Sequence, residues 1–250
     1  MNRRLEFNFH KKVVLITGAT RGIGKQLASD FENLGAELIL TGTNLEKINE
    51  LNKNSAKNAR YFYADFTKEE SLQEFIRKLA DYKKIDVCIN NAGINRINYL
   101  TETLMEDWDD IIKVNLRAPF ALCRQVARLM KNNGYGRIVN IASIFGVISK
   151  EKRSIYSSSK SGLIGLTKAM AIELAPHNIL VNCLSPGFVL TDLTRQILSE
   201  SEIKDLESKI PAKRLATPQD VSNVVLFLSS DLNTYITGQN IIVDGGFVSA

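Results

Sequence analysis

The sequence has few of the residues on which disulfide, metal and histidine chemistry depend. Its 250 residues include three cysteines and two histidines. Cys88, Cys123 and Cys183 are odd in number and far apart, without a Cys-x-x-Cys pair, so we expect neither disulfides nor structural zinc. With only His10 and His177 present, neither a histidine-based triad nor a histidine-rich metal site is expected. We therefore predict no metal site.

Long apolar runs are also missing. No stretch reaches the length of a membrane span, and the N-terminal residues MNRRLEFNFHKK contain no apolar run of signal-peptide type. We therefore expect a cytoplasmic protein without a membrane partner. The formal net charge is +5, but no basic stripe with interleaved aromatic residues is present, so a nucleic-acid partner is not expected.

Short β-branched or aliphatic runs alternate with helical patterns along the whole chain. The predicted strands are Val13–Thr17, Leu38–Thr41, Tyr61–Ala64, Val87–Asn90, Ile138–Ile141, Leu180–Leu184 and Ile241–Val243. The predicted helices include Gly24–Leu34, Ser71–Asp81, Trp108–Lys131, Tyr156–Ala175 and Pro218–Ser229. This alternation predicts right-handed crossovers and a parallel sheet covered on both faces. We expect an α/β protein with a single-domain Rossmann fold over residues 1–250, a doubly wound parallel sheet of about seven strands with helices on both faces.

A glycine-rich turn, TGATRGIG, follows the first predicted strand and opens a helix. Gly18 would permit the tight turn, Gly22 would let the backbone approach phosphates, and Gly24 would let the helix pack close to the strand. Such a turn places a dinucleotide pyrophosphate on a helix N-terminus. The alternative is a glycine-rich turn without a ligand.

The end of the second predicted strand indicates which dinucleotide binds. An NAD site commonly has an acidic residue there, but the corresponding position is Gly42. Arg21 in the glycine turn could pair with a 2′-phosphate through its guanidinium group, and Thr43 and Asn44 could add neutral hydrogen bonds. We therefore predict NADP(H) as the cofactor.

A tyrosine and a lysine one helical turn apart, Tyr156 and Lys160, follow Ser143 at the end of a predicted strand. These side chains suit a carbonyl/alcohol redox reaction, since the phenol can give a proton to a substrate oxygen that the serine holds. A phenol titrates near ~10, and an ammonium ~4 Å away would favour the phenolate by up to ~4 kcal/mol, or about three pKa units. We therefore expect the pKa of Tyr156 to lie close to neutral pH. The alternative is a surface lysine packed over a half-buried tyrosine.

Further motifs occur in a fixed order around these residues. They are TGATRGIG, NNAG at Asn90–Gly93, VNL containing Asn115, then Ser143, YSSSK, and SPG followed by Thr191. In this combination the chain, from about Lys12 to Gly246, resembles the short-chain dehydrogenase/reductase family.

The resemblance implies a catalytic tetrad of Asn115, Ser143, Tyr156 and Lys160. Tyr156 would donate the proton, Ser143 would hydrogen-bond the substrate oxygen, and Lys160 would bind the nicotinamide ribose. Asn115 would hold a water that links Lys160 to solvent.

The resemblance also implies cofactor contacts beyond the glycine turn, with Asp65 at the adenine and Thr191 among the residues at the carboxamide and pyrophosphate. Asp65 could instead cap a strand end. The predicted cofactor-binding residues are Gly18, Thr20, Arg21, Gly22, Ile23, Gly24, Thr43, Asn44, Asp65, Phe66, Asn91, Ala92, Gly93, Tyr156, Lys160, Pro186, Gly187, Val189 and Thr191.

The C-terminal third is most similar to the 3-oxoacyl-thioester reductases of fatty-acid biosynthesis. SPGFVLTDLT, IPAKRLATPQDV, FLSSD, YITGQ and VDGG carry this similarity. It implies NADPH-dependent reduction of a 3-oxoacyl thioester to an alcohol. NNAGINR and ELAPHNI also resemble gluconate-type enzymes, so a sugar, sugar-acid or polyol dehydrogenase is the alternative. An alternative of another class is a non-catalytic NADP-binding protein, although such proteins usually lose the tyrosine or the lysine.

The same resemblance implies partners. In the 3-oxoacyl-thioester reductases a basic patch near the active-site mouth docks acyl carrier protein; Arg137 matches one of its arginines, and His177 occupies the other position. In the loop SKEKRS, Lys150, Lys152 and Arg153 either attract an acidic substrate group or form a solvated charged loop.

Two expectations concern movement and assembly. Residues 191–210 are polar with a helical pattern, which predicts a substrate lid. The resemblance implies a homotetramer built on the helices that contain Asn115 and Tyr156, with the C-terminal strand forming a second contact.

Overall fold

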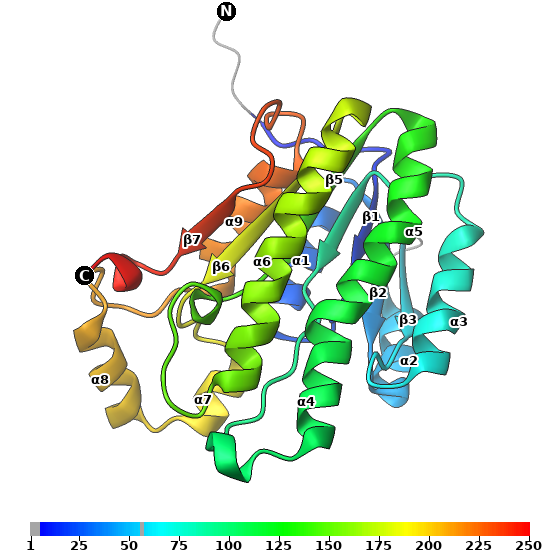
Figure 1. Cartoon of the computed structure of the whole chain (residues 1–250). Helices are drawn as coiled ribbons and strands as arrows, with labels where there is room; N and C mark the ends of the chain where they lie inside the picture. The colour runs from blue at the N-terminus through cyan, green and yellow to red at the C-terminus, as the bar shows by residue number, and fades with distance from the viewer. Residues whose placement is uncertain (1–5, 56–57) are drawn as a thin grey trace, which may run out of the picture.

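Seven parallel strands form one sheet in the order β3-β2-β1-β4-β5-β6-β7 in the computed structural model, which describes residues 6–55 and 58–250 (Figure 1). Each neighbouring pair is parallel. The strands are β1 Val13–Ile16, β2 Glu37–Gly42, β3 Ala59–Tyr63, β4 Val87–Asn90, β5 Gly136–Ile141, β6 Ile179–Pro186 and β7 Asn240–Val243. The predicted doubly wound Rossmann sheet is confirmed.

Helices cover both faces of this sheet. Figure 1 shows α3, α5 and α6 in front of the strands and α1 and α9 behind them. The helices are α1 Gly22–Asn33, α2 Leu45–Asn54, α3 Glu69–Ala80, α4 Met105–Ile112, α5 Ala118–Asn133, α6 Ser154–Leu174, α7 Asp192–Ile197, α8 Glu200–Lys209 and α9 Pro218–Ser229. Within the described residues, none of these helices is long and apolar enough to cross a membrane.

The alternation of side chains along β1 explains the two-sided core. Val13 and Leu15 point into the cluster formed with α3 and α5, whereas Val14 and Ile16 point into the cluster formed with α1 and α9. Because successive strand residues face opposite sides, a strand buried on both faces must be apolar throughout, as the sequence VVLI is.

The helix predicted over Trp108–Lys131 is less regular than expected. The chain runs from α4 into a π-helical turn, Lys113–Arg117, and then into α5. Asn115 lies inside this turn and is completely buried. Single π-helical turns are rare within α-helices and are frequent at functional sites.

Helix α2 was not among the predicted segments. Asn44 begins it, and the Asn44 side chain accepts a hydrogen bond from the backbone N–H of Lys47 at 2.9 Å. Of its ten residues only Ile48 is buried, so the helix has almost no apolar stripe by which to be recognised.

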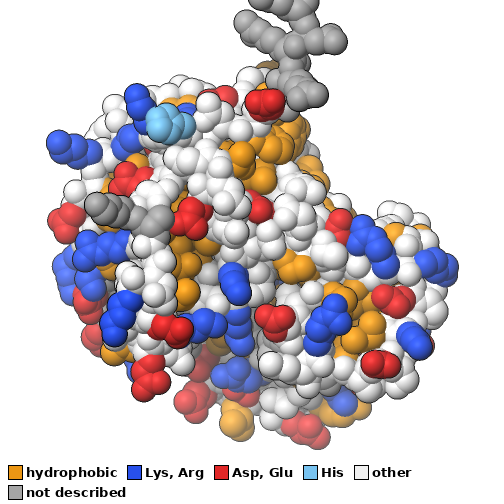
Figure 2. Space-filling model, turned by 180° about the vertical axis from the view of Figure 1, so that it is seen from behind, with side chains coloured by type: hydrophobic (Ala, Val, Ile, Leu, Met, Phe, Trp, Pro, Cys, Tyr) orange, Lys and Arg blue, Asp and Glu red, His pale blue; other side chains and the backbone are white. Residues whose placement is uncertain are grey.

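The segment predicted as a lid is helical, in two pieces. Thr191 caps α7, and Ser199 caps α8 in a reciprocal capping box with Glu202. Both helices follow β6 and lie at the end of the molecule where α4 and the first turn of α6 are found (Figure 1). The face seen from behind the view of Figure 1 has basic and acidic side chains intermingled (Figure 2).

The chain reverses its direction of travel across the sheet between β1 and β4. β2 and β3 lie on one side of β1, and β4 pairs with its other side. In open parallel sheets, ligands bind outside the carboxyl ends of the strands at such a switch point. The glycine turn after β1 and the NNAG motif after β4 meet there.

Candidate active site

The glycine turn after β1 has the backbone that its sequence predicts. Gly18 and Gly22 have φ values of +64° and +54°, in the left-handed region that favours glycine. Gly24 has no room for a side chain, because a Cβ atom there would overlap the carbonyl oxygen of Gly18. Ile23 lies between them at the start of α1, partly buried against the core.

The first turn of α1 is open to an anion. Arg21 occupies the N-cap position with an extended backbone, but its side chain makes no hydrogen bond to the N–H groups of the first turn. No acidic residue lies in that turn. The free N–H groups of such a turn attract negative charge. Thr191 lies beside this turn although it is far away in the sequence, since a Cβ atom on Gly22 would lie 3.4 Å from the Thr191 Cγ2 atom.

Asn91 joins the ends of β4 and β1. Its side-chain amide donates to the carbonyl oxygens of Thr17 and Gly18, at 2.9 and 3.0 Å. The Thr17 hydroxyl in turn accepts from the backbone N–H groups of Asn91 and Ala92, at 3.0 and 2.9 Å. The structure therefore gives Asn91 and Ala92 the role of holding the glycine turn in shape.

The end of β2 carries no carboxylate. The Thr20 side chain lies directly over Gly42, where any Cβ atom would collide with it. Thr43 is exposed, whereas the side-chain oxygen of Asn44 is occupied in capping α2. Arg21 is exposed and near this end of the sheet, as the prediction of NADP(H) requires.

In the turn after β3, the side chain of Asp65 makes polar contacts within the turn, whereas that of Phe66 is buried in the core. The Asp65 carboxylate accepts from the Thr67 N–H at 3.1 Å and from the Thr67 hydroxyl at 2.7 Å, so it caps the turn that leads to α3. The Phe66 side chain is buried and packs on Phe75, with ring centroids 6.3 Å apart. Phe66 can therefore offer a ligand only its backbone.

Four side chains of the predicted tetrad come from three elements at the carboxyl edge of the sheet. Ser143 follows β5, Tyr156 and Lys160 lie in the first two turns of α6, and Asn115 lies in the π-helical turn. A Cβ atom on Gly93 would lie 3.5 Å from both the Asn115 Oδ1 atom and the Lys160 Nζ atom. Asn115 and Lys160 therefore converge beside the NNAG turn.

A chain of hydrogen bonds connects Asn115 to the tyrosine. The Asn115 amide donates to the Ser159 hydroxyl at 3.1 Å, and that hydroxyl donates to the Tyr156 carbonyl oxygen at 2.8 Å. Lys160 donates to the carbonyl oxygen of Ile141, at the end of β5, at 2.8 Å. These bonds fix the first turns of α6 against the sheet.

The expectation that Lys160 brings the pKa of Tyr156 close to neutral pH is wrong for this structure. Burial raises the pKa of Tyr156, and a hydrogen bond from Ser143 and the charge of Arg153 oppose this only in part. The Lys160 Nζ atom lies 5.6 Å from the centre of the Tyr156 ring, and burial lowers the pKa of Lys160 to about 8. Loss of hydration outweighs the attraction between charges here, which a sequence cannot reveal.

The segment after β6 approaches the next strand closely. Pro186 pairs with Val243, and the Gly187 N–H donates to the carbonyl oxygen of Val243 at 2.9 Å. A Cβ atom on Gly187 would lie 2.7 Å from the Cβ atom of Asp244, so only glycine fits. Val189 forms a bridge to Ala216, which leads the chain to Thr191 beside the glycine turn.

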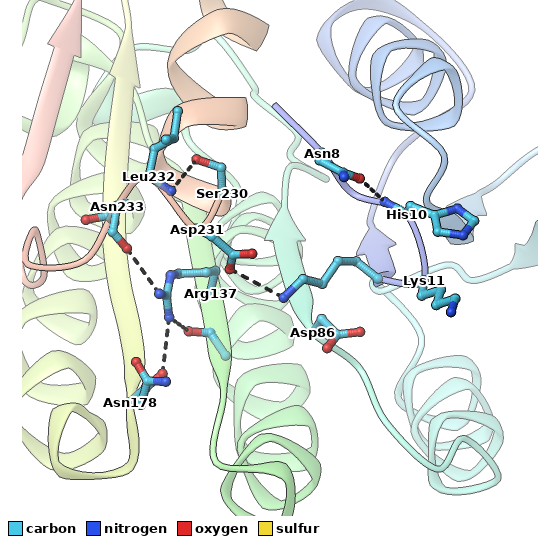
Figure 3. A network of polar contacts seen from close by, with 12 residues as sticks. Asn8, His10, Lys11, Asp86, Arg137, Asn178, Ser230, Asp231, Leu232 and Asn233 are labelled. Atoms are coloured by element: carbon cyan, nitrogen blue, oxygen red, sulfur yellow. Dashed lines mark hydrogen bonds and ion pairs between the residues drawn. The ribbon is translucent and has the colours of Figure 1, made fainter. Parts of the chain in front are cut away.

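The prediction that Arg137 docks a partner at the active-site mouth is wrong. Arg137 is buried, and its guanidinium group donates to the carbonyl oxygens of Gly136, Asn178 and Asn233 at 2.9, 3.2 and 3.1 Å (Figure 3). It lies at the amino end of β5, about 20 Å of strand away from Ser143. His177, just before β6, is at the same amino edge.

Sequence reasoning missed a row of aromatic rings near the tetrad. Phe145 and Phe188 meet edge to face with centroids 6.3 Å apart, and Phe188 meets Phe247 in the same way at 5.2 Å. Phe145 comes two residues after Ser143, Phe188 directly after the SPG motif and Phe247 directly after VDGG, and these positions were the available signal.

Comparisons with known proteins agree with this arrangement. A family model described as enoyl-(acyl carrier protein) reductase matches residues 18–248. The chain is 41% identical to the 3-oxoacyl-(acyl-carrier-protein) reductase FabG of Buchnera aphidicola, over 94% of the chain and 97% of the relative. It is 37% identical to the enzyme of that name from Escherichia coli, over 96% and 98%. Among solved structures, it is similar to a gluconate 5-dehydrogenase from Burkholderia cenocepacia in complex with NADP and tartrate, with a TM-score of 0.88, 30% identity and 98% of each chain covered.

Proposed function

We propose that this chain, which belongs to the short-chain dehydrogenase/reductase family, is an NADPH-dependent enzyme that reduces a 3-oxoacyl thioester to the corresponding 3-hydroxyacyl thioester. The observation that carries the proposal is the convergence of Asn115, Ser143, Tyr156 and Lys160 beside a glycine turn shaped for a dinucleotide.

The residues of the glycine turn suit NADP(H). Gly18, Gly22 and Gly24 leave space for a pyrophosphate at the start of α1, and Thr191 closes this space from the side. Arg21 would pair with the 2′-phosphate, which Gly42 leaves unopposed by negative charge. When bound, NADPH supplies a hydride to the carbonyl carbon of the substrate. The other cofactor-binding residues predicted from the sequence, which include Thr20 and Val189, are proposed as contacts of the same NADP(H) molecule.

The tetrad supplies and replaces the proton. Because burial raises the pKa of Tyr156, its phenol keeps its proton at neutral pH and can give it to a substrate oxygen held by Ser143. Lys160, with a pKa of about 8, can release and regain a proton near neutral pH, so it can return one to the tyrosine. The Asn115 Oδ1 atom faces the same point and retains a lone pair for a water in this relay.

The identity of the relatives supports the thioester as substrate. Two of them, 41% and 37% identical over nearly the whole chain, are named as 3-oxoacyl-(acyl-carrier-protein) reductases, whereas the gluconate 5-dehydrogenase is 30% identical. The alternative activity, that of a sugar, sugar-acid or polyol dehydrogenase, therefore has less support. We place the chain in fatty-acid biosynthesis in the cytoplasm, with acyl carrier protein as the carrier of its substrate.

Two parts of the proposal concern the surface of the chain. Phe120 on α5 and Ile172 on α6 are 50% and 79% exposed, which supports a homotetramer built on these helices. Ile242 on the edge strand β7 is 38% exposed and would belong to the second contact. The helices α7 and α8, within residues 191–210, would act as a lid over the substrate.

The experiment is a comparison of substrates with one preparation of the protein. NADPH oxidation is followed with acetoacetyl groups on acyl carrier protein and on coenzyme A, and NADP⁺ reduction is followed with gluconate. Turnover of the thioesters, faster on the carrier protein, is expected. Turnover of gluconate alone, in protein that binds NADPH, would refute the thioester assignment.

A further inference from the structure

Arg153 lies near the proposed catalytic tyrosine, and among the described residues its guanidinium group has no hydrogen-bond acceptor and no ion-pair partner. It is half-buried, and its Nε atom is completely buried without a hydrogen-bond partner. Across the described residues, 6–55 and 58–250, its guanidinium group takes part in no hydrogen bond or ion pair. A polar or charged group removed from water without a partner is costly, so an acceptor from outside the chain is expected there.

The contrast with Arg137 makes this feature specific. The Nε atom of Arg137 is also buried without a hydrogen-bond partner, so the two arginines differ at their terminal nitrogens. Those of Arg137 donate to three backbone carbonyl oxygens, although this residue is more deeply buried (Figure 3). Arg137 therefore has the partners expected of an arginine that stabilises the fold. Arg153 lacks them.

The position of Arg153 directs it toward the reacting groups. It precedes Tyr156 by three residues at the start of α6, a spacing that places two side chains on one helix face. Its Cζ atom lies 5.5 Å from the centre of the Phe145 ring, and the Phe145 N–H donates to the Ser143 hydroxyl at 3.2 Å. The charge of Arg153 lowers the pKa of Tyr156, as expected of neighbouring groups.

Lys150 strengthens the positive character of this place. Its Nζ atom lies 5.7 Å from the centre of the same Phe145 ring. Lys152, by contrast, turns away to Tyr99, with its Nζ atom 4.3 Å from that ring centre. Two cations thus lie at the ring of Phe145, the residue whose N–H donates to Ser143, and both would attract an oxygen that carries negative or partial negative charge.

A 3-oxoacyl thioester carries such an oxygen at a short distance from the reacting carbonyl. Its second carbonyl group, that of the thioester, is separated from the first by a single carbon atom. When the 3-oxo oxygen lies at Ser143 and Tyr156, the thioester oxygen must lie within a few ångströms of them.

We propose that Arg153 is a specificity-determining residue whose guanidinium group donates a hydrogen bond to the thioester carbonyl oxygen of the substrate. This inference rests on the proposed function. The enzyme would prefer a 3-oxoacyl thioester over a ketone without a second oxygen, because only the thioester provides a hydrogen-bond acceptor for the Arg153 guanidinium group.

The test compares Arg153→Gln with wild type on three oxo compounds: the acetoacetyl thioester of N-acetylcysteamine, free acetoacetate, and the monoketone cyclohexanone. Lys152→Gln is the matched control, since it removes the same charge from the same loop. We expect Arg153→Gln to lower kcat/KM for the thioester by about 10- to 100-fold. It should lower the preference for the thioester over cyclohexanone at least tenfold. Arg153→Lys should retain part of that preference, and Lys152→Gln should retain all of it.

The other outcomes are separable. An equal loss on all three compounds would mean that Arg153 acts only through Tyr156 or the fold, and an unchanged kcat/KM would mean that it does not act at all; both overturn the proposal. A loss of kcat/KM confined to acetoacetate would mean that Arg153 binds the carboxylate of that compound, and this too would overturn the proposal. If wild type binds NADPH but turns over no thioester, the proposed function itself fails.

Discussion

The side chain of Asn115 forms two hydrogen bonds to the backbone of Ile94. Its amide donates to the Ile94 carbonyl oxygen, and its oxygen accepts from the Ile94 N–H, each at 2.9 Å. The π-helical turn aims Asn115 at the loop after β4, so this pair joins the loop to the helix that precedes α5. The same asparagine faces Lys160 across Gly93. Asn115 therefore holds the loop after β4 in place and is also a predicted catalytic residue.

Replacing Asn115 should therefore reduce both stability and turnover. Asn115→Ala leaves the N–H and C=O of Ile94 unpaired, which should cost about 2 to 4 kcal/mol in the free energy of unfolding. Because the position of Asn115 beside Lys160 is also lost, kcat should fall at least tenfold. Urea unfolding and NADPH turnover measure the two effects. Asn132→Ala, at an exposed position near the end of α5, should change neither. If Asn115→Ala is as stable as wild type, the two hydrogen bonds to Ile94 do not stabilise the protein.

Arg21 should distinguish NADPH from NADH. Arg21→Gln removes a charged partner of the 2′-phosphate but nothing that NADH uses, so the Kd for NADPH should rise about tenfold or more. The Kd for NADH should stay the same. Fluorescence titration of both cofactors measures this, with Lys25→Gln, an exposed position of the same helix, as the control. Equal weakening of both cofactors would exclude a contact of Arg21 with the 2′-phosphate.

Two glycine-to-alanine substitutions should have opposite effects. At Gly24 a Cβ atom would overlap the Gly18 carbonyl and lie 2.6 Å from the Asn91 amide, so stability should fall by about 1 to 3 kcal/mol, with weaker NADPH binding. At Gly165, exposed within α6, a Cβ atom would meet nothing within 4 Å beyond the local backbone of its own helix, and alanine should raise stability by about 1 kcal/mol. Thermal unfolding of both variants decides the matter. Similar changes at both sites would mean that the close packing at Gly24 does not exist in solution.

Lys160 should make stability depend on pH. Its pKa is lowered from 10.5 to about 8, so the unfolded chain binds more protons between these values, and wild-type stability should rise with pH across this window. The penalty for the buried charge below pH 8 is on the order of 3 kcal/mol. Lys160→Met removes the penalty together with one hydrogen bond, so it should abolish turnover yet raise the melting temperature at neutral pH.

The stability gain of Lys160→Met over wild type should shrink as the pH approaches 10.5, which melting temperatures measured across the range will detect. Lys168→Met, at an exposed position of the same helix, should show no such trend. A gain that is constant with pH would contradict a buried amine whose pKa is lowered.

Local spacing made the main parts of the site predictable. Gly18, Gly22 and Gly24 encode the turn directly, and four residues of helix bring Tyr156 and Lys160 to one face. The burial of Arg137, the raised pKa of Tyr156 and the ring of Phe145 under Arg153 could not be predicted in this way. Each depends on which residues from distant segments surround a side chain, and hydration and charge follow from those surroundings. The π-helical turn at Asn115 was missed because its residues are ordinary helix formers.

The central claim is that Tyr156 protonates a 3-oxoacyl thioester while NADPH reduces it, and paired turnover measurements test it most directly. Wild type and Tyr156→Phe are compared for NADPH oxidation with acetoacetyl-acyl carrier protein, after titration shows that both bind NADPH. We expect wild type to form the 3-hydroxyacyl product and Tyr156→Phe to lose on the order of 10²-fold or more in rate. Near-normal turnover by Tyr156→Phe, or none by wild type that binds NADPH, would contradict the account.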